Sequence, residues 1–447
     1  MKTPFVFSGM AGVIMCLFFQ GISSTFAQNS NDNTVPRFDI GITSIPAGTE
    51  IKLTLKGRFQ NYNSKPKHQN DKYDRSINSP KSVNFTPDGK KFYIQSLEGY
   101  TTSVYDTESM TLIKEIIHDF KNANNHLFLN NENTVFDYKY RDTYSNFNTF
   151  KGKPVESCMS HEGRYLWVTY YRRDFDINAE CPSALAIIDT HTDSIVRVMP
   201  TGPLPKMIAC SPDNKFIAVT HWGDNTVGII DISSDSVMKF QYVSHLIVDY
   251  KAKLDFGPTP VNRDQKCGHC LRGTVFSPDG KYLLVGKMGG AGGIAIFTIP
   301  GFEYLGTVTG QKNNLRHMLI NDNDLIISTN STGFVQKAPL QELIDAKNTN
   351  PGTTVTYTSW ENCYVGTGAR TIDATKDGKY IFACVNNQCK IAVIRSSDMK
   401  LICSVKADAY PVGMALSPDE TLLIVTSQGK SDKGGNSVMV YEVTHFQ

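Results

Sequence analysis

Basic residues recur at one position of an internal repeat, and this spacing is the feature of the chain that most directly suggests chemistry. A turn phrase of the Ser-Pro-Asp-Gly type occurs seven times, and the residue six places before its central residue is basic in five copies. In chain order, the seven aligned residues are Lys81, Val155, Lys206, Arg272, Arg316, Arg370 and Val412. Lys and Arg side chains gathered in one place bind carboxylates or phosphates through charge-assisted hydrogen bonds. The pattern therefore predicts an anion-binding site.

Further basic and aromatic residues lie between later strands of the same copies. Arg172 belongs to the second copy, His221 and Trp222 to the third, and Lys287 to the fourth. Rings interleaved with cations suit an anion that has a flat or sugar-like body. We expect His221 to lie in a surface loop, where it is the favoured general base. We expect His317 to point to the opposite face of its strand, as a core histidine.

Two other interpretations of these residues stay open. The basic position can belong to the repeat consensus, with each side chain bonded to a neighbouring carbonyl or carboxylate. A hydrolase that uses the same residues would instead hold a divalent cation with carboxylates, for which Glu156, Asp373 and Asp224 are the candidates. A ring of cations opposes that metal, so we predict no metal site and no cofactor. The sequence contains no Ser-His-Asp spacing or phosphate-binding glycine loop that would assign a catalytic residue.

One short cysteine motif, Cys267-Gly268-His269-Cys270, also has the spacing of a reactive site. A low-pKa thiol in such a motif needs a helix N-terminus, and here a strand follows instead. A zinc site needs two more ligands. We therefore rank a structural disulfide first, a metal site second and redox catalysis third.

The elements that position these residues are predicted from the repeat. Each turn favours a tight reversal, because Pro presets φ, Asp bonds to the backbone and Gly accepts positive φ. Apolar runs flank every turn, and strand-turn-strand units at this period are typical of propeller blades. The chain is predicted to be an all-β, seven-bladed β-propeller. In such a fold the five basic residues would converge on the mouth of the central channel.

The N-terminal strand is predicted to close the ring. The last copy is one strand short, and residues 50–56 alternate polar and apolar side chains as an edge strand does. We expect this strand to complete the seventh blade. Residues 121–151 and 242–270 are longer than the repeat requires, and they are predicted either to cap the funnel or to dock a partner.

Composition and the N-terminus define the expected compartment. The 45 Lys and Arg residues nearly balance 43 Asp and Glu residues, so a basic site must come from clustering, and nucleic acid is not favoured as a partner. Residues 1–27 have the charged start, apolar core and small-residue exit of a signal peptide. We predict a flexible leader at 28–49, the propeller at 50–447, no membrane span, and export to the periplasm or the cell surface.

The third copy carries a family resemblance. Val219 to Asp231 (VTHWGDNTVGIID) is similar to the Tyr-Val-Thr-Asn consensus and its tail, and residues 205–214 are similar to the half that contains the turn. The chain thus resembles the YVTN-type, YncE-like, surface-layer-like exported seven-bladed propellers. The resemblance implies a binding scaffold that recognises an anionic small molecule, a glycan or a cell-envelope protein at the funnel. The alternative is a lactonase-like hydrolase or a lyase that uses the same pocket.

Overall fold

A computed structural model describes residues 38–446 apart from 47–49, 130–133, 137, 142–145, 255–256 and 431–433. The predicted signal peptide at 1–27 lies outside the described residues. None of the helices that the structure does describe is both long enough and apolar enough to cross a bilayer. Within the predicted leader, residues 38–46 pack on the last two blades through Phe38, Ile40 and Ile42.

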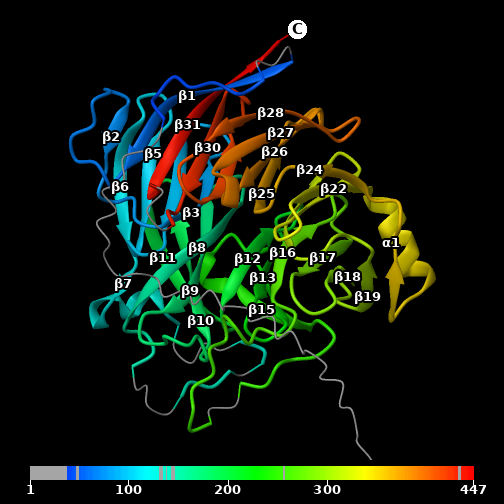
Figure 1. The fold of residues 1–447 in the computed structure, drawn as a ribbon. Helices are drawn as coiled ribbons and strands as arrows, with labels where there is room; N and C mark the ends of the chain where they lie inside the picture. The colour runs from blue at the N-terminus through cyan, green and yellow to red at the C-terminus, as the bar shows by residue number, and fades with distance from the viewer. Residues whose placement is uncertain are drawn as a thin grey trace, which may run out of the picture. The chain divides into compact units, whose positions relative to one another are not determined.

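The described chain forms seven small antiparallel sheets, as predicted (Figure 1). From the innermost strand outward, the first three blades are β3 (Pro80–Phe85), β4 (Lys91–Ser96), β5 (Thr101–Asp106) and β6 (Thr111–Ile117); β8 (Phe150–Ser160), β9 (Tyr165–Arg173), β10 (Ser183–Asp189) and β11 (Ser194–Thr201); and β12 (Pro205–Cys210), β13 (Phe216–His221), β14 (Thr226–Asp231) and β15 (Gln241–Ile247). A short strand, β7 (Asp119–Phe120), pairs with β8. The fourth strand of the third blade, β15, begins at Gln241, after a 3-10 turn at Val237–Lys239.

The remaining four blades follow the same plan. They are β16 (Leu271–Phe276), β17 (Tyr282–Lys287), β18 (Gly293–Thr298) and β19 (Tyr304–Thr309); β20 (Leu315–Asn321), β21 (Asp324–Thr329), β22 (Phe334–Pro339) and β24 (Glu361–Tyr364); β25 (Ala369–Ala374), β26 (Tyr380–Val385), β27 (Lys390–Arg395) and β28 (Lys400–Lys406); and β29 (Pro411–Leu416), β30 (Leu422–Ser427), β31 (Ser437–His445) and β1 (Ile51–Gln60). Two parallel edge strands, β2 (Asp71–Tyr73) on β1 and β23 (Thr353–Thr356) on β19, extend blades seven and four. Helical segments are α1 (Leu340–Thr349), η1 (Asn122–Leu127) and η3 (Asn386–Gln388).

The N-terminal strand closes the ring as predicted. β1 pairs antiparallel with β31, from Ile51 opposite His445 to Gln60 opposite Ser437, and the two run side by side in Figure 1. Neighbouring innermost strands contact each other all the way round, including β29 with β3. β1 thereby covers the outer edge of β31, which would otherwise be an exposed strand edge.

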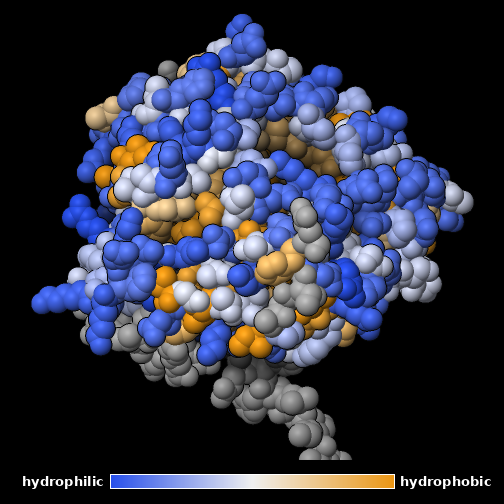
Figure 2. Space-filling model, turned by 90° about the horizontal axis from the view of Figure 1, so that it is seen from above, coloured by the Kyte–Doolittle hydropathy of each residue, from blue (hydrophilic) through white to orange (hydrophobic). Residues whose placement is uncertain are grey.

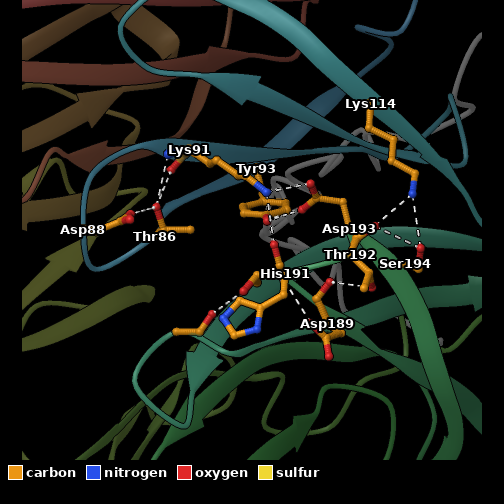
Figure 3. A network of polar contacts seen from close by, with 12 residues as sticks. Thr86, Asp88, Lys91, Tyr93, Lys114, Asp189, His191, Thr192, Asp193 and Ser194 are labelled. Carbon is orange, nitrogen blue, oxygen red and sulfur yellow. Dashed lines mark hydrogen bonds and ion pairs between the residues drawn. The ribbon is translucent and has the colours of Figure 1, made fainter.

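Seven buried clusters hold the blades together, one at each blade-to-blade interface. Both faces of each sheet are therefore covered, which explains the nearly continuous apolar runs in the sequence. Polar contacts join blades as well. Between blades one and two, Asp193 accepts hydrogen bonds from the Tyr93 hydroxyl at 2.5 Å and from Lys91 Nζ at 2.7 Å (Figure 3).

The repeated turn has one local hydrogen-bond scheme. In blade four, Ser277 Oγ donates to Asp279 Oδ1 at 2.6 Å and accepts from the Tyr282 backbone N–H at 2.9 Å. The same Ser/Thr-to-Asp bond occurs at Thr86, Ser211, Thr375 and Ser417. These bonds lower the pKa of the turn aspartates, among them Asp88 and Asp419.

Buried neutral histidines predict that the protein loses stability in acid. His118 lies between Thr102 Oγ1 (2.7 Å) and the Tyr170 hydroxyl (2.8 Å), and burial lowers its pKa to about 3. An unfolded histidine titrates near pH 6.5, so between those values the unfolded state binds the extra proton. His118 should therefore cost about 1.4 kcal/mol of stability per pH unit as the pH falls below 6.5.

Urea unfolding at a series of pH values measures this slope. His118→Asn should flatten it by about one proton, whereas the same change at the exposed His126 should leave it unaltered. Equal slopes for the two variants would contradict the assignment.

Candidate functional site

A β-bulge lies at the aligned position of every innermost strand, the position that holds a basic residue in five of the seven blades. The register shifts at this position in all seven blades, for example between Leu271 and Thr274 in β16 and between Ala369 and Ile372 in β25. A bulge bends its strand and re-aims the side chain at the extra residue. The bulge thus turns the side chain of the aligned residue away from the direction it would have in a regular strand.

The five basic residues lie within electrostatic reach of one another; together they are called the basic ring. Burial, followed by the charges of Arg370, Lys206 and Arg272, holds the pKa of Lys81 well below its usual value. Burial and then the charges of Arg370 and Arg272 do the same to Arg316. The empty ring therefore carries electrostatic repulsion that an anion would relieve.

Two members of the ring are paired with carboxylates. Arg272 Nη2 lies 3.0 Å from Glu156 Oε1, and Lys206 Nζ lies 3.2 Å from Asp264 Oδ1. Lys206 also lies over the rings of Tyr171 (3.9 Å) and Trp222 (5.0 Å). We call Lys206 and Arg272, with these two carboxylates, the compensated side.

The other three members, Lys81, Arg316 and Arg370, form the uncompensated side. Among the described residues, none of the three forms a salt bridge. Lys81 donates to the amide oxygen of Gln428, and Arg316 Nη1 lies 3.1 Å from Met288 Sδ. The Nε atoms of Arg316 and Arg370 are buried and have no hydrogen-bond partner in the described chain. This side offers both charge and N–H donors to an anion.

The pKa of Tyr410 is affected by the positive charges on the uncompensated side. Arg370 and Lys430 lie 5.8 and 5.1 Å from the centre of its ring. Burial by itself would raise the pKa of the phenol, but the charges of Arg370, Arg316 and Lys430 outweigh burial and lower it.

Sequence reasoning missed Tyr410. The residue two places before the basic position has positive φ in six of the seven copies, at Ser79, Leu204, Cys270, Asn314, Gly368 and Tyr410. Of these only Tyr410 carries a large side chain.

The second insertion reaches the funnel. Its Asp264 pairs with Lys206, and the Asp264 carbonyl accepts a hydrogen bond from Trp222 Nε1 at 3.2 Å. Glu180 anchors both insertions, because its carboxylate binds Arg141 Nη2 at 2.8 Å and the Val261 N–H at 2.9 Å. Of the two predicted roles, the contacts of Asp264 and Trp222 agree with a cap over the compensated side.

A central cavity lies directly below the basic ring. It has a volume of about 280 Å³ and receives residues from all seven innermost strands. Polar lining residues include Glu156, His317 and Asp373, and apolar ones include Met207, Met318 and Met414. Burial raises the pKa of Asp373 to about 6. The expectation that His317 faces away from the channel is wrong, because its side chain lines this cavity.

Two of the predicted residues, His221 and Lys287, are turned away from the funnel. His221 is not in a surface loop: it is the last residue of β13, fully buried, with Nδ1 bonded to Thr226 and Nε2 to Thr201 (2.8 Å each). Lys287 ends β17 at the equivalent place and is bound to Asp249 (3.0 Å) and Thr307 (2.9 Å). In both cases the final residue of the second strand bonds to one residue of its own blade and one of the preceding blade, which explains both corrections.

Arg172 and Trp222 complete the second predicted ring. Arg172 lies over the ring of Tyr171 at 5.8 Å and donates to the carbonyl of Ile177, outside the basic ring. Trp222 is 7% exposed and does lie at the funnel, beside Lys206. The ligand-binding roles of all nine predicted residues stay predictions.

Cys267 and Cys270 form the disulfide that the sequence analysis ranked first. The same segment packs at Asn225, whose side-chain oxygen accepts from the His269 N–H at 2.7 Å. Cys384 and Cys389 are free thiols. Among the described residues, no group of three or more His, Cys, Asp or Glu side chains has the arrangement of a metal site.

The fold is shared with solved structures of low sequence identity. A chain of hydrazine synthase from Kuenenia stuttgartiensis superposes with a TM-score of 0.55 at 14% identity, covering 84% of this chain and 99% of that one. The β-propeller domain of Cps50 (Swd1) from Myceliophteria thermophila gives 0.55 at 12% identity, covering 82% and 97%. A chain of a mitotic checkpoint complex gives 0.54 at 10%, covering 93% and 96%.

These likenesses and the sheet order define the class: the chain is a seven-bladed β-propeller. No known family model matches it, and no curated protein matches it either. The YVTN-type resemblance therefore rests on the repeat residues themselves. Identities this low carry the architecture and no activity.

Proposed function

We propose that this protein is an exported β-propeller that binds an anionic ligand at the uncompensated side of its funnel. The observation that carries the proposal is the grouping of Lys81, Arg316 and Arg370 without a carboxylate partner among the described residues. Like charges held together in a partly buried site are costly unless an anion compensates them. The consensus interpretation, in which each cation bonds to a neighbouring carbonyl or carboxylate, describes Lys206, Arg272 and, through the amide oxygen of Gln428, Lys81, but not Arg316 or Arg370.

Calorimetric titration with inorganic phosphate and with citrate tests the proposal. We expect binding that is indifferent to chelators and that weakens steeply between about 50 and 200 mM salt, because exposed charges are screened over about 10 Å. No heat of binding with either anion at low salt would overturn it. Binding that requires a divalent cation would favour the lactonase-like alternative instead.

Glu156 is expected to compete with the ligand for the ring. Its carboxylate binds Arg272, and its charge also acts on Lys81 and Arg316. Removing one negative charge about 8 Å from a bound anion should strengthen phosphate binding about fivefold. Titration of Glu156→Gln measures this gain. Glu98→Gln, which breaks a pair with Lys153 outside the ring (2.7 Å), serves as the control and should change nothing. A weaker Glu156→Gln complex would contradict the competition.

A lyase that uses the same pocket is a second candidate function, and Tyr410 is the observation that favours it. A phenol whose pKa is lowered by three neighbouring cations loses its proton more readily than an ordinary tyrosine, so more of it is in the phenolate form that can act as a general base. Elimination from an acidic oligosaccharide that is lost in Tyr410→Phe and unaffected by chelators would support this candidate over the binding scaffold.

A further inference from the structure

The central cavity and the basic ring form one continuous site, and the cavity has its own chemistry. Glu156 belongs to both, because it pairs with Arg272 in the ring and lines the cavity. An anion held by Arg316 and Arg370 would therefore stand at the entrance to the cavity. What fits below the anion depends on size and on the lining.

Size favours a ring-sized group. The cavity measures about 280 Å³, and an engineered protein cavity of about 150 Å³ is large enough to take up benzene. A single ring with one or two substituents thus fits, whereas a polymer chain does not.

The lining favours an uncharged body. Apolar residues such as Met207, Ile208 and Leu319 make up about half of the lining, together with Met318 and Met414 of the clusters between blades. Most polar groups in the cavity wall are already bonded. The Asp373 oxygens accept from the backbone N–H groups of Ala374 (2.9 Å) and Leu416 (2.8 Å).

His317 is the exception in this wall. Its Nδ1 is buried and has no partner among the described residues. Burial, together with the charges of Arg272 and Arg370, lowers its pKa to about 3, so the imidazole stays neutral. A neutral imidazole offers one N–H donor and one acceptor. It suits a hydroxyl or carbonyl group rather than a charge.

We infer that the ligand is a compact cyclic carboxylate or phosphate whose uncharged ring enters the central cavity while its anionic group binds Arg316 and Arg370. This inference rests on the proposed anion-binding function and specifies its ligand class. A hydroxyl or carbonyl on the ring would bond to His317. An acidic polysaccharide is the contrasting class, because its chain would have to lie across the mouth.

Four small probes test the inference on the full-length chain: acetate, inorganic phosphate, benzoate and 3-hydroxybenzoate. Benzoate should bind about 10- to 100-fold more tightly than acetate, because it buries a ring. Ala415→Leu fills the cavity and should remove that advantage while leaving acetate and phosphate affinity within about twofold. His317→Ala should remove only the further gain of 3-hydroxybenzoate over benzoate. If Ala415→Leu does not fold, His317→Ala still provides a test.

The outcomes separate the two proposals. Equal affinities for benzoate and acetate, or a benzoate advantage that survives Ala415→Leu, would overturn the ligand class while anion binding stands. Tighter binding of oligogalacturonate than of any single-ring anion would do the same in favour of a glycan. Absence of binding for all probes would overturn the proposed function and this inference together.

Discussion

Replacing both Arg316 and Arg370 by alanine is expected to abolish anion binding in practical terms. Each guanidinium supplies a charge and a buried Nε–H donor that has no partner in the described chain. A hydrogen bond from a charged group contributes about 1.5–3 kcal/mol, so losing two should weaken phosphate or citrate binding about 100-fold or more. Titration calorimetry of the double variant gives the value directly.

The matched control is Lys206→Gln on the compensated side. Lys206 already pairs with Asp264 at 3.2 Å, so its removal should weaken binding less than about tenfold. Thermal unfolding also distinguishes an anion-binding ring from a structural one. The double arginine variant should be at least as stable as the wild type, because it relieves repulsion within the ring. A less stable variant with unchanged anion affinity would mean that the ring is structural.

The largest expected effect on stability comes from Arg58, which fastens the closing strand. Arg58 is 3% exposed and binds Asp71 in β2 at 2.5 Å and Asp408, which precedes β29, at 3.4 Å. Arg58→Ala leaves two buried carboxylates without their cation. Breaking a buried ion pair from one side typically costs about 3–5 kcal/mol, and the ring closes at this seam.

Urea unfolding of Arg58→Ala against Lys56→Ala tests this account of closure. Lys56 lies in the same strand and pairs with Glu442, but both side chains are about half exposed (51% and 43%). Its loss should cost about 1 kcal/mol or less. Similar losses for the two variants would show that the Arg58 cluster does not hold the seam.

The architecture could be predicted from the sequence because a similar turn with flanking apolar strands recurs in every blade. Five of the seven turns pair a Ser or Thr with an Asp, and a Pro, Leu or Ala stands directly before the aligned position in every copy. Counting back from the turn therefore located all five members of the ring. The seventh blade was predicted to close because its own copy lacked a strand, and β1 supplies it.

The parts of the site that escaped prediction depend on side-chain direction and on insertions. His221 and Lys287 carry the right chemistry, but each bonds within its own blade and to the preceding blade. Successive side chains of a strand alternate between faces, so a count that is off by one residue reverses the face. The pairing of Lys206 with Asp264 depends on a long insertion that has no repeat to align with. Glu156 meets Arg272 across two blades, a contact between residues 116 positions apart that no local pattern encodes.

The surface offers no simpler guide to function. The face shown in Figure 2 is largely hydrophilic with several separate hydrophobic patches. Exposed apolar side chains such as Ile113 (47%) and Ile117 (62%) lie on the outer strand β6. Scattered apolar groups of this kind are ordinary on soluble domains. The basic ring is distinguished by its charge and burial, and for that reason it carries the functional proposal.

The most direct measurement is a crystal structure of the protein soaked in selenate, with the anion located by the anomalous scattering of selenium. The account predicts a selenium peak within hydrogen-bond distance of Arg316 and Arg370, beside Tyr410, and its loss in the double alanine variant. A peak at the compensated side beside Lys206, or no peak in the funnel at all, would contradict the claim that the uncompensated cations form an anion site.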